Sequence, residues 1–235
     1  MSGVAASVRG RAWVGEEALF APVDLELRAG DWTCLLGPSG VGKSTILRLI
    51  AGLETGARFE GEVERDRPVA LMAQDAGLIG WLDVLGNVTL GARLRGEAPD
   101  LARADALIEA VGLADRAHHR PENLSGGQRQ RVALARTLFE DRALILLDEP
   151  FSALDARTRA QMQDLSARLL AGRTVLLVTH DPAEAARLGD RILLLRETGI
   201  SEWPLPSTRP EGAARPYDAP EVLALQTDLM RGMMA

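Results

Sequence analysis

Short apolar runs alternate along the chain with longer segments in which apolar residues recur at helical spacing. Residues 43–51, 101–111, 126–140 and 155–170 carry apolar residues three and four positions apart, which is the spacing of one helix face. Strands that alternate with helices predict an α/β fold built on a parallel sheet. The predicted strands are residues 23–28, 32–36, 60–65, 69–72, 143–147, 174–178 and 191–195.

The composition changes near residue 198, after which prolines repeatedly interrupt a polar segment. Proline ends regular structure, so this pattern predicts a loop or an extended tail. Apolar residues at helical spacing within residues 222–229 allow one short helix there. We therefore expect a folded domain at residues 1–197 and a proline-rich C-terminal tail at residues 198–235.

A glycine-rich segment follows the strand predicted at residues 32–36 and opens the next predicted helix. It satisfies the pattern G-x-x-x-x-G-K-[ST], in which backbone N–H groups and the helix N-terminus surround a phosphate. Lys43 is the only lysine among 27 basic side chains, and its compact ammonium suits the β- and γ-phosphates, whereas the Ser44 hydroxyl suits Mg²⁺. The alternative, a tight turn without a ligand, leaves this register of lysine and hydroxyls unexplained. The predicted phosphate loop consists of Gly37, Pro38, Ser39, Gly40, Val41, Gly42, Lys43, Ser44 and Thr45.

Two carboxylates follow the apolar strand predicted at residues 143–147. Asp148 ends this strand, and we expect it to orient Mg²⁺ and its water ligands. Glu149 is expected to accept a proton from the attacking water, a contribution typically worth about 10²- to 10⁴-fold in rate. The alternative is an acidic helix entry after a core strand, which the neighbouring phosphate loop disfavours.

A second glycine-rich helix start consists of Ser125, Gly126, Gly127 and Gln128, with Ser125 placed to cap the helix. The alternative for this segment taken alone is a helix cap with two flexible residues. Beside the phosphate loop it becomes a second anion cradle. Because only one Asp-Glu pair follows a predicted strand, we expect this cradle to serve a nucleotide held by another subunit.

Together these motifs resemble the ATP-binding subunit of ABC transporters over about residues 4–196. Residues 124–136 are similar to the signature motif of that family and its helix, and Gln74 to the Q-loop glutamine. Residues 152–155 resemble the D-loop, and His180 stands where the switch histidine belongs. All of these motifs occur in the order found in the family.

The resemblance implies a P-loop NTPase core with a parallel sheet, an antiparallel β subdomain and a helical signature-motif subdomain at about residues 75–140. It implies ATP and Mg²⁺ as cofactors, and a head-to-tail dimer in which residues 125–127 of one chain close over the ATP of the other. In that arrangement Gln74 senses Mg²⁺ and the attacking water, and His180 contacts the γ-phosphate and positions Glu149. The implied Mg²⁺ ligands are Ser44, Gln74 and Asp148.

Two further interpretations depend on aromatic and apolar residues outside these motifs. The family usually stacks an aromatic side chain, mostly tyrosine, on adenine, and Trp13 is the candidate here, although a tryptophan could equally pack on the core. Residues 75–88 are apolar for a loop and include Trp81. They predict a groove that receives a short helix from a membrane permease, the alternative being a small satellite core.

A separate ATP-binding chain without a fused transmembrane half is similar to bacterial importers. No apolar run approaches the roughly 20 residues that cross a bilayer. The implied partners are transmembrane permease subunits and, indirectly, an external solute-binding protein, with the chain peripheral at the cytoplasmic face of the inner membrane. Residues 74–96 resemble the nitrate/sulfonate/taurine group and its thiamine or hydroxymethylpyrimidine relatives, of which the thiamine or hydroxymethylpyrimidine branch is our single expectation.

Two other function classes fit the sequence less well than an importer. A soluble mechanical ATPase of DNA repair or translation would usually carry a second nucleotide domain, a coiled-coil insertion or a basic surface. The net charge of −6 argues against nucleic acid as a partner. A small-molecule kinase would leave residues 125–128 and His180 unexplained.

Overall fold

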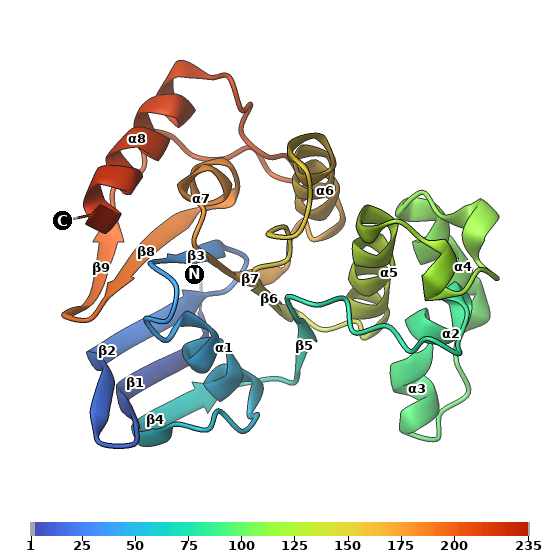
Figure 1. Cartoon of the computed structure of the whole chain (residues 1–235), viewed down its shortest axis with the longest axis horizontal. Helices are drawn as coiled ribbons and strands as arrows, with labels where there is room; N and C mark the ends of the chain where they lie inside the picture. The colour runs from blue at the N-terminus through green and yellow to red at the C-terminus, as the bar shows by residue number, and fades with distance from the viewer. Residues whose placement is uncertain (1–2, 235) are drawn as a thin grey trace.

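The structure is a computed structural model that describes residues 3–234 (Figure 1). Its centre is a six-stranded sheet in the order β5-β6-β7-β3-β8-β9. Neighbouring strands run parallel except β9, which pairs antiparallel with β8. The predicted α/β class with a parallel sheet is thus confirmed. The strands are β3 Trp32–Leu36, β5 Val69–Met72, β6 Leu144–Asp148, β7 Thr174–Thr179, β8 Arg191–Arg196 and β9 Gly199–Trp203.

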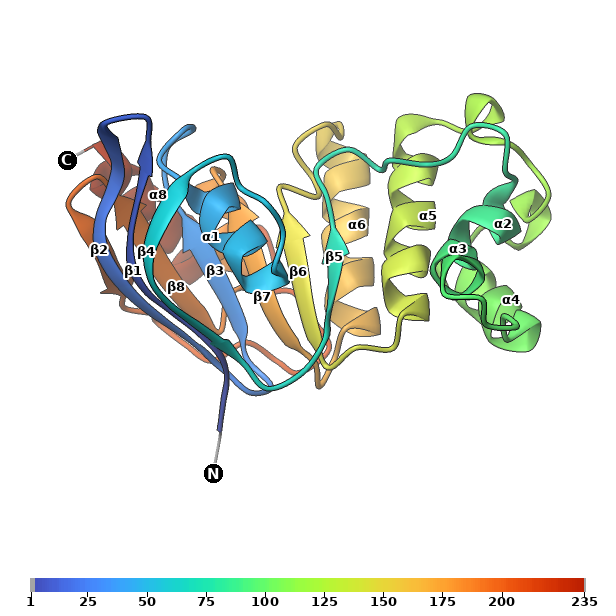
Figure 2. The ribbon, with the colours of Figure 1, turned by 90° about the horizontal axis from the view of Figure 1, so that it is seen from below.

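Both faces of this sheet are covered, which explains why β3, β6 and β7 are buried along their whole length and mostly apolar. On one face, helix α1 (Lys43–Ala51) lies between the six-stranded sheet and a three-stranded antiparallel sheet (Figure 2). Helices α6 (Ala156–Leu169) and α7 (Pro182–Leu188) pack on the other face. The three-stranded sheet has the order β2-β1-β4 and consists of β1 Val4–Val14, β2 Glu17–Arg28 and β4 Arg58–Arg65.

A group of helices lies to one side of the two sheets and contacts them through its longest member (Figure 1). The pattern at residues 75–88 predicts a loop, but α2 forms at the end of that segment because the Asp83 carboxylate accepts a hydrogen bond from Gly86 N at 2.7 Å. A helix of five residues is too short to leave a periodic signal. The helices are α2 Val84–Val88, α3 Leu90–Leu94, α4 Leu101–Ala110 and α5 Gly126–Phe139, with 3₁₀ turns at Ala114–Arg116 and Pro121–Asn123.

The C-terminal segment is packed against the core, whereas the proline pattern predicts a loop or extended tail. Strand β9 extends the six-stranded sheet, and α8 (Pro220–Met234) packs on α7. Between them Arg215 is 3% exposed, and its guanidinium donates to the carbonyls of Ala186 and Gly189. Buried arginine contacts of this kind depend on tertiary structure and leave no local pattern. Within residues 3–234, no helix is both long and apolar enough to span a membrane.

Candidate functional site

The predicted phosphate loop joins the carboxyl end of β3 to the N-terminus of α1. Gly42 is the residue before the helix and adopts φ 100°, a conformation that favours glycine. A Cβ at Gly42 would lie 2.6 Å from the Phe20 ring, whereas a Cβ at Gly40 would meet nothing within 4 Å. No side chain caps α1, so its first backbone N–H groups remain free to bind an anion. The loop therefore fits a phosphate.

The Lys43 side chain lies against this loop and is 4% exposed. Its Nζ donates to Gly37 O at 2.9 Å and to Pro38 O at 2.8 Å. Burial lowers the pKa of Lys43, and the nearby carboxylates of Glu149 and Asp148 oppose this shift. The ammonium is consequently poorly solvated and directed by carbonyls into the loop, where a phosphate would be a stronger partner.

A hydroxyl and a carboxylate meet beside the loop. Ser44 Oγ donates to Asp148 Oδ1 at 2.8 Å, which joins the start of α1 to the end of β6. Burial raises the pKa of Asp148, and the hydrogen bond from Ser44 acts in the opposite direction. These oxygens are the hard ligands that Mg²⁺ takes, and residues 3–234 contain no cluster of three or more His, Cys, Asp or Glu that could hold a metal by itself. The pair fits a Mg²⁺ ion that also binds nucleotide oxygens and water.

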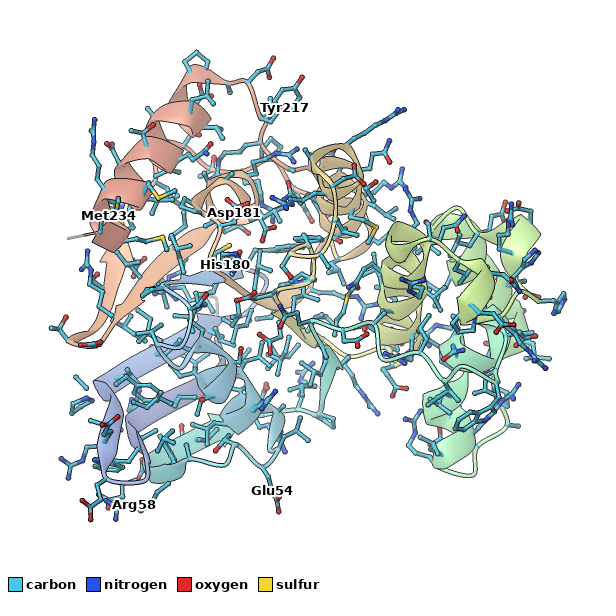
Figure 3. All side chains as sticks on the ribbon, viewed as in Figure 1. Glu54, Arg58, His180, Asp181, Tyr217 and Met234 are labelled. Atoms are coloured by element: carbon cyan, nitrogen blue, oxygen red, sulfur yellow. The ribbon has the colours of Figure 1, made fainter. Side chains whose placement is uncertain are left out.

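Glu149, Gln74 and His180 converge next to this pair, although they come from three separate segments. Glu149 Oε2 lies 3.1 Å from His180 Nδ1 and 3.4 Å from Gln74 Nε2. Figure 3 labels His180, which follows β7 directly, near the middle of the molecule. Glu149 has φ 45°, which is rare for a residue with a side chain, and its N–H donates to Val178 O at 2.9 Å. With this backbone conformation the carboxylate meets His180 and Gln74.

Residues 125–128 form the start of α5 in the helical group. Ser125 Oγ accepts from Gln128 N at 3.3 Å, and Gln128 Oε1 accepts from Ser125 N at 2.9 Å, a reciprocal capping box. A Cβ at Gly127 would lie 2.6 Å from Thr158 Cγ2 on α6, so only glycine fits this approach. Among residues 3–234, no hydrogen bond joins this segment to the phosphate loop of the same chain. The structure thus does not bring the two predicted cradles together within one chain.

Trp13 lies on the outward face of the three-stranded sheet and is half-buried. The guanidinium carbons of Arg11 and Arg58 lie 4.8 Å and 4.6 Å from the centre of its ring. The side chain therefore packs on two arginines and not in the core. These two guanidinium groups compete with an adenine base for the Trp13 ring, and the adenine assignment stays a prediction.

Helix α5 supports the segment that carries Gln74, a connection that the sequence pattern did not reveal. Gln130 Nε2 donates to Gln74 O at 3.0 Å. The Arg136 guanidinium donates to Ala76 O at 2.6 Å and to Gly77 O at 2.9 Å, and burial lowers the pKa of Arg136. Gln130 and Arg136 thus both hold one short segment, residues 74–77, against α5. Their position on the signature helix was the only available signal.

The apolar segment at residues 75–88 combines core and surface. Val84 and Val88 are buried in the core of the helical group. The buried Asn87 side chain donates to the carbonyls of Ile79, Leu82 and Asp83, and in this way shapes the preceding turn. Trp81 lies on that turn and is 77% exposed. The satellite-core alternative thus holds for the valines, whereas Trp81 is available to a partner.

A buried carboxyl near His180 was also missed by sequence reasoning. Glu184 on α7 is 2% exposed, and the Thr179 hydroxyl donates to its Oε2 at 2.6 Å. Burial raises the pKa of Glu184 to about 7, and the hydrogen bond from Thr179 and the nearby Arg159 and His180 only partly oppose it. The carboxyl therefore changes its charge within the physiological pH range.

We expect Glu184→Gln to remove a pH dependence of stability. Because the pKa of Glu184 is higher in the folded chain than the ordinary glutamate value of 4.5, its stabilising contribution is complete below pH 4.5 and is lost as the pH rises through 7. The free energy of unfolding of Glu184→Gln, relative to wild type, should increase by about 3 kcal/mol between pH 5 and pH 8. Urea denaturation at several pH values measures this difference. Parallel pH profiles for the two chains would contradict it, and Glu109→Gln, at an exposed site on α4, is the control.

Comparisons with known proteins agree with this geometry. The sequence profile of the family described as ABC transporter matches residues 20–152. An uncharacterized ABC transporter ATP-binding protein of Haemophilus influenzae is 46% identical and is aligned over 92% of each chain. Aliphatic sulfonates import ATP-binding proteins of Paracoccus denitrificans (45% identical, 80% of this chain and 77% of the relative) and Pseudomonas aeruginosa (42%, 99% and 86%) also match.

A solved structure with the same fold is a dimeric ATP-binding cassette in a post-hydrolysis state bound to ADP and Pi. It superposes with a TM-score of 0.74 at 32% identity and covers 86% of this chain and 99% of its own. The relatives named above with a stated solute are sulfonate importers, and this does not support the expected thiamine or hydroxymethylpyrimidine branch.

Proposed function

Because the chain belongs to the ABC transporter family of ATP-binding proteins, we propose that it is the ATPase subunit of a membrane importer and that the imported solute is a sulfonate. One observation carries the catalytic part of this proposal. The Glu149 carboxylate lies within 3.4 Å of Gln74 and 3.1 Å of His180, at the sheet edge where Ser44 and Asp148 meet. The sulfonate part rests on the named relatives, which also leave the mechanical ATPase alternative without support.

Each residue at this edge of the six-stranded sheet has a separate role in ATP hydrolysis. The phosphate-loop N–H groups and Lys43 bind the β- and γ-phosphates. Ser44, Gln74 and Asp148 would hold Mg²⁺, which supplies charge stabilisation on the phosphate oxygens when bound. Glu149 accepts the proton of the attacking water, and His180 orients the Glu149 carboxylate for this transfer.

We further propose that two copies assemble head to tail, so that residues 125–127 of one chain meet the ATP on the phosphate loop of the other. Two facts support this arrangement. Ser125 and Gly126 are exposed and have no hydrogen bond to the phosphate loop of their own chain within residues 3–234. The similar cassette of known structure is a dimer. Hydrolysis would cleave the γ-phosphate from ATP. Because both copies bind that phosphate, its loss would remove their shared contact and let the pair open.

The partners in this proposal are permease subunits in the inner membrane and, through them, an external solute-binding protein. The exposed Trp81, on the turn that Asn87 shapes, is the proposed contact with a short permease helix. This places the chain at the cytoplasmic side of that membrane as a peripheral subunit.

The experiment that tests the function measures alkanesulfonate uptake by vesicles that contain the permease subunits and this chain. We expect uptake that depends on ATP and on the chain. Trp81→Ala should lose uptake at least tenfold while ATP affinity stays within about twofold. Trp81 lies on the turn before α2 in the helical group, whereas the phosphate loop lies between β3 and α1, and the loss of Trp81 removes an exposed anchor of about 1–3 kcal/mol. Leu94→Ala removes another exposed apolar side chain of the helical group and serves as the control.

Normal uptake with Trp81→Ala would contradict the docking surface. Uptake of a thiamine precursor, but not of a sulfonate, would contradict the proposed solute and leave the ATPase assignment intact.

A further inference from the structure

Arg159, on the first turn of α6, joins two loops that flank the catalytic residues. Its Nη2 donates to Leu154 O at 3.1 Å, and its Nη1 donates to Asp181 Oδ2 at 3.1 Å. Leu154 belongs to the loop at residues 152–155, and Asp181 directly follows His180. One guanidinium thus bridges two segments that are far apart in the sequence.

The loop at residues 152–155 is tied to the catalytic carboxylate on one side and to the signature segment on the other. Ser152 Oγ donates to Glu149 O at 3.0 Å and lies 3.4 Å from Gln74 Nε2. Leu154 and Gly126 line a common pocket. In the head-to-tail pair, where the signature segment meets the partner's nucleotide, this loop lies beside that contact.

Asp181 controls how the chain leaves β7 after His180. Its Oδ1 accepts from Ala183 N at 2.8 Å and so caps α7, while its N–H donates to Thr179 Oγ at 3.0 Å. Figure 3 labels His180 and Asp181 next to each other. Because consecutive residues share one backbone, a shift of Asp181 moves the imidazole that lies 3.1 Å from Glu149.

The contacts of Arg159 need a guanidinium in particular. Its two terminal nitrogens each reach one acceptor, the Asp181 carboxylate or the Leu154 carbonyl, whereas an ammonium would have to reach both acceptors from one nitrogen. The Nε of Arg159 is buried and has no hydrogen-bond partner among residues 3–234.

We propose that Arg159 is a positioning residue, which holds the His180 loop in register with the loop at residues 152–155 and so aligns His180 with Glu149. The inference rests on the proposed function, because only a paired, ATP-hydrolysing chain uses this alignment. In that pair, closure of the partner on the signature segment pushes on the loop at residues 152–155, and Arg159 passes the displacement to His180.

The test compares steady-state ATP hydrolysis by the full-length chain and its variants. Arg159→Met keeps the length and packing of the side chain but removes both hydrogen bonds, so kcat should fall at least tenfold while KM for ATP stays within about twofold. Arg159→Lys should recover part of the rate, since an ammonium reaches one of the two acceptors. Arg157→Ala, which removes an exposed arginine two residues away, should behave as wild type.

A double-mutant cycle tests whether Arg159 acts on His180 through Asp181. Asp181→Asn keeps an oxygen for Ala183 N but weakens the contact with Arg159, so the losses of Asp181→Asn and Arg159→Met should combine to less than their product. Wild-type kcat in Arg159→Met, a rise of KM instead of a fall of kcat, or losses that multiply would overturn the inference. A wild-type chain that binds ATP without hydrolysing it would instead contradict the proposed function, and the role of Arg159 with it.

Discussion

Glu149→Gln is expected to lower the rate of ATP hydrolysis by about 10²- to 10⁴-fold while leaving ATP binding intact. The amide has the shape of the carboxylate and retains a hydrogen-bonding group 3.1 Å from His180 Nδ1 and 3.4 Å from Gln74 Nε2. It cannot accept the proton of an attacking water, so only the chemical step is removed. Because the γ-phosphate persists, the ATP-bound pair should also live longer.

Phosphate release measures the rate of hydrolysis, and an equilibrium titration measures ATP affinity. Size-exclusion chromatography in the presence of ATP measures how much of the chain is paired. Glu54→Gln, at an exposed site far from His180 in Figure 3, makes the same chemical change outside the site and should hydrolyse ATP as wild type does. Unchanged turnover in Glu149→Gln would remove Glu149 as the general base.

Lys43→Ala is expected to weaken ATP binding by about 10- to 100-fold, since a hydrogen bond from a charged donor contributes about 1.5–3 kcal/mol. Lys43 is buried, its pKa is lowered by desolvation, and its Nζ has two loop carbonyls as partners. A phosphate that replaces these carbonyls binds the positively charged Lys43 ammonium. Because that ammonium is poorly solvated, its attraction to the phosphate is stronger than it would be in water. Lys43→Arg should not restore the affinity, because a planar guanidinium cannot take the place of the compact Nζ that donates to both Gly37 O and Pro38 O.

Calorimetric titration with ATP measures this loss. Arg48→Ala removes a positive charge from the exposed side of the same helix and should change ATP affinity by less than about threefold. Native affinity in Lys43→Ala would show that the ammonium does not contact the nucleotide.

The sequence pattern predicts a helix, strand or cap correctly where residues close together in the chain determine it. The apolar run before Asp148 is buried on both faces of the sheet, and the pattern placed that strand within one residue of its observed bounds, Leu144–Asp148. The capping role of Ser125 follows from a few consecutive residues and is present with its reciprocal partner Gln128. Strand β9 was not predicted, because its polar pattern does not indicate a strand. Its residues form one by pairing with β8, a tertiary contact.

The amino-acid order alone indicated the fold class, the predicted phosphate loop and the acidic pair at the end of β6, because each depends on residues adjacent in the chain and on backbone periods. The folded chain was needed for the left-handed backbone at Glu149, the approach of His180 and Gln74 to its carboxylate, and the bridge made by Arg159. These features join distant segments, and the strand order of the six-stranded sheet decides which loops meet at its edge. No local pattern encodes that order.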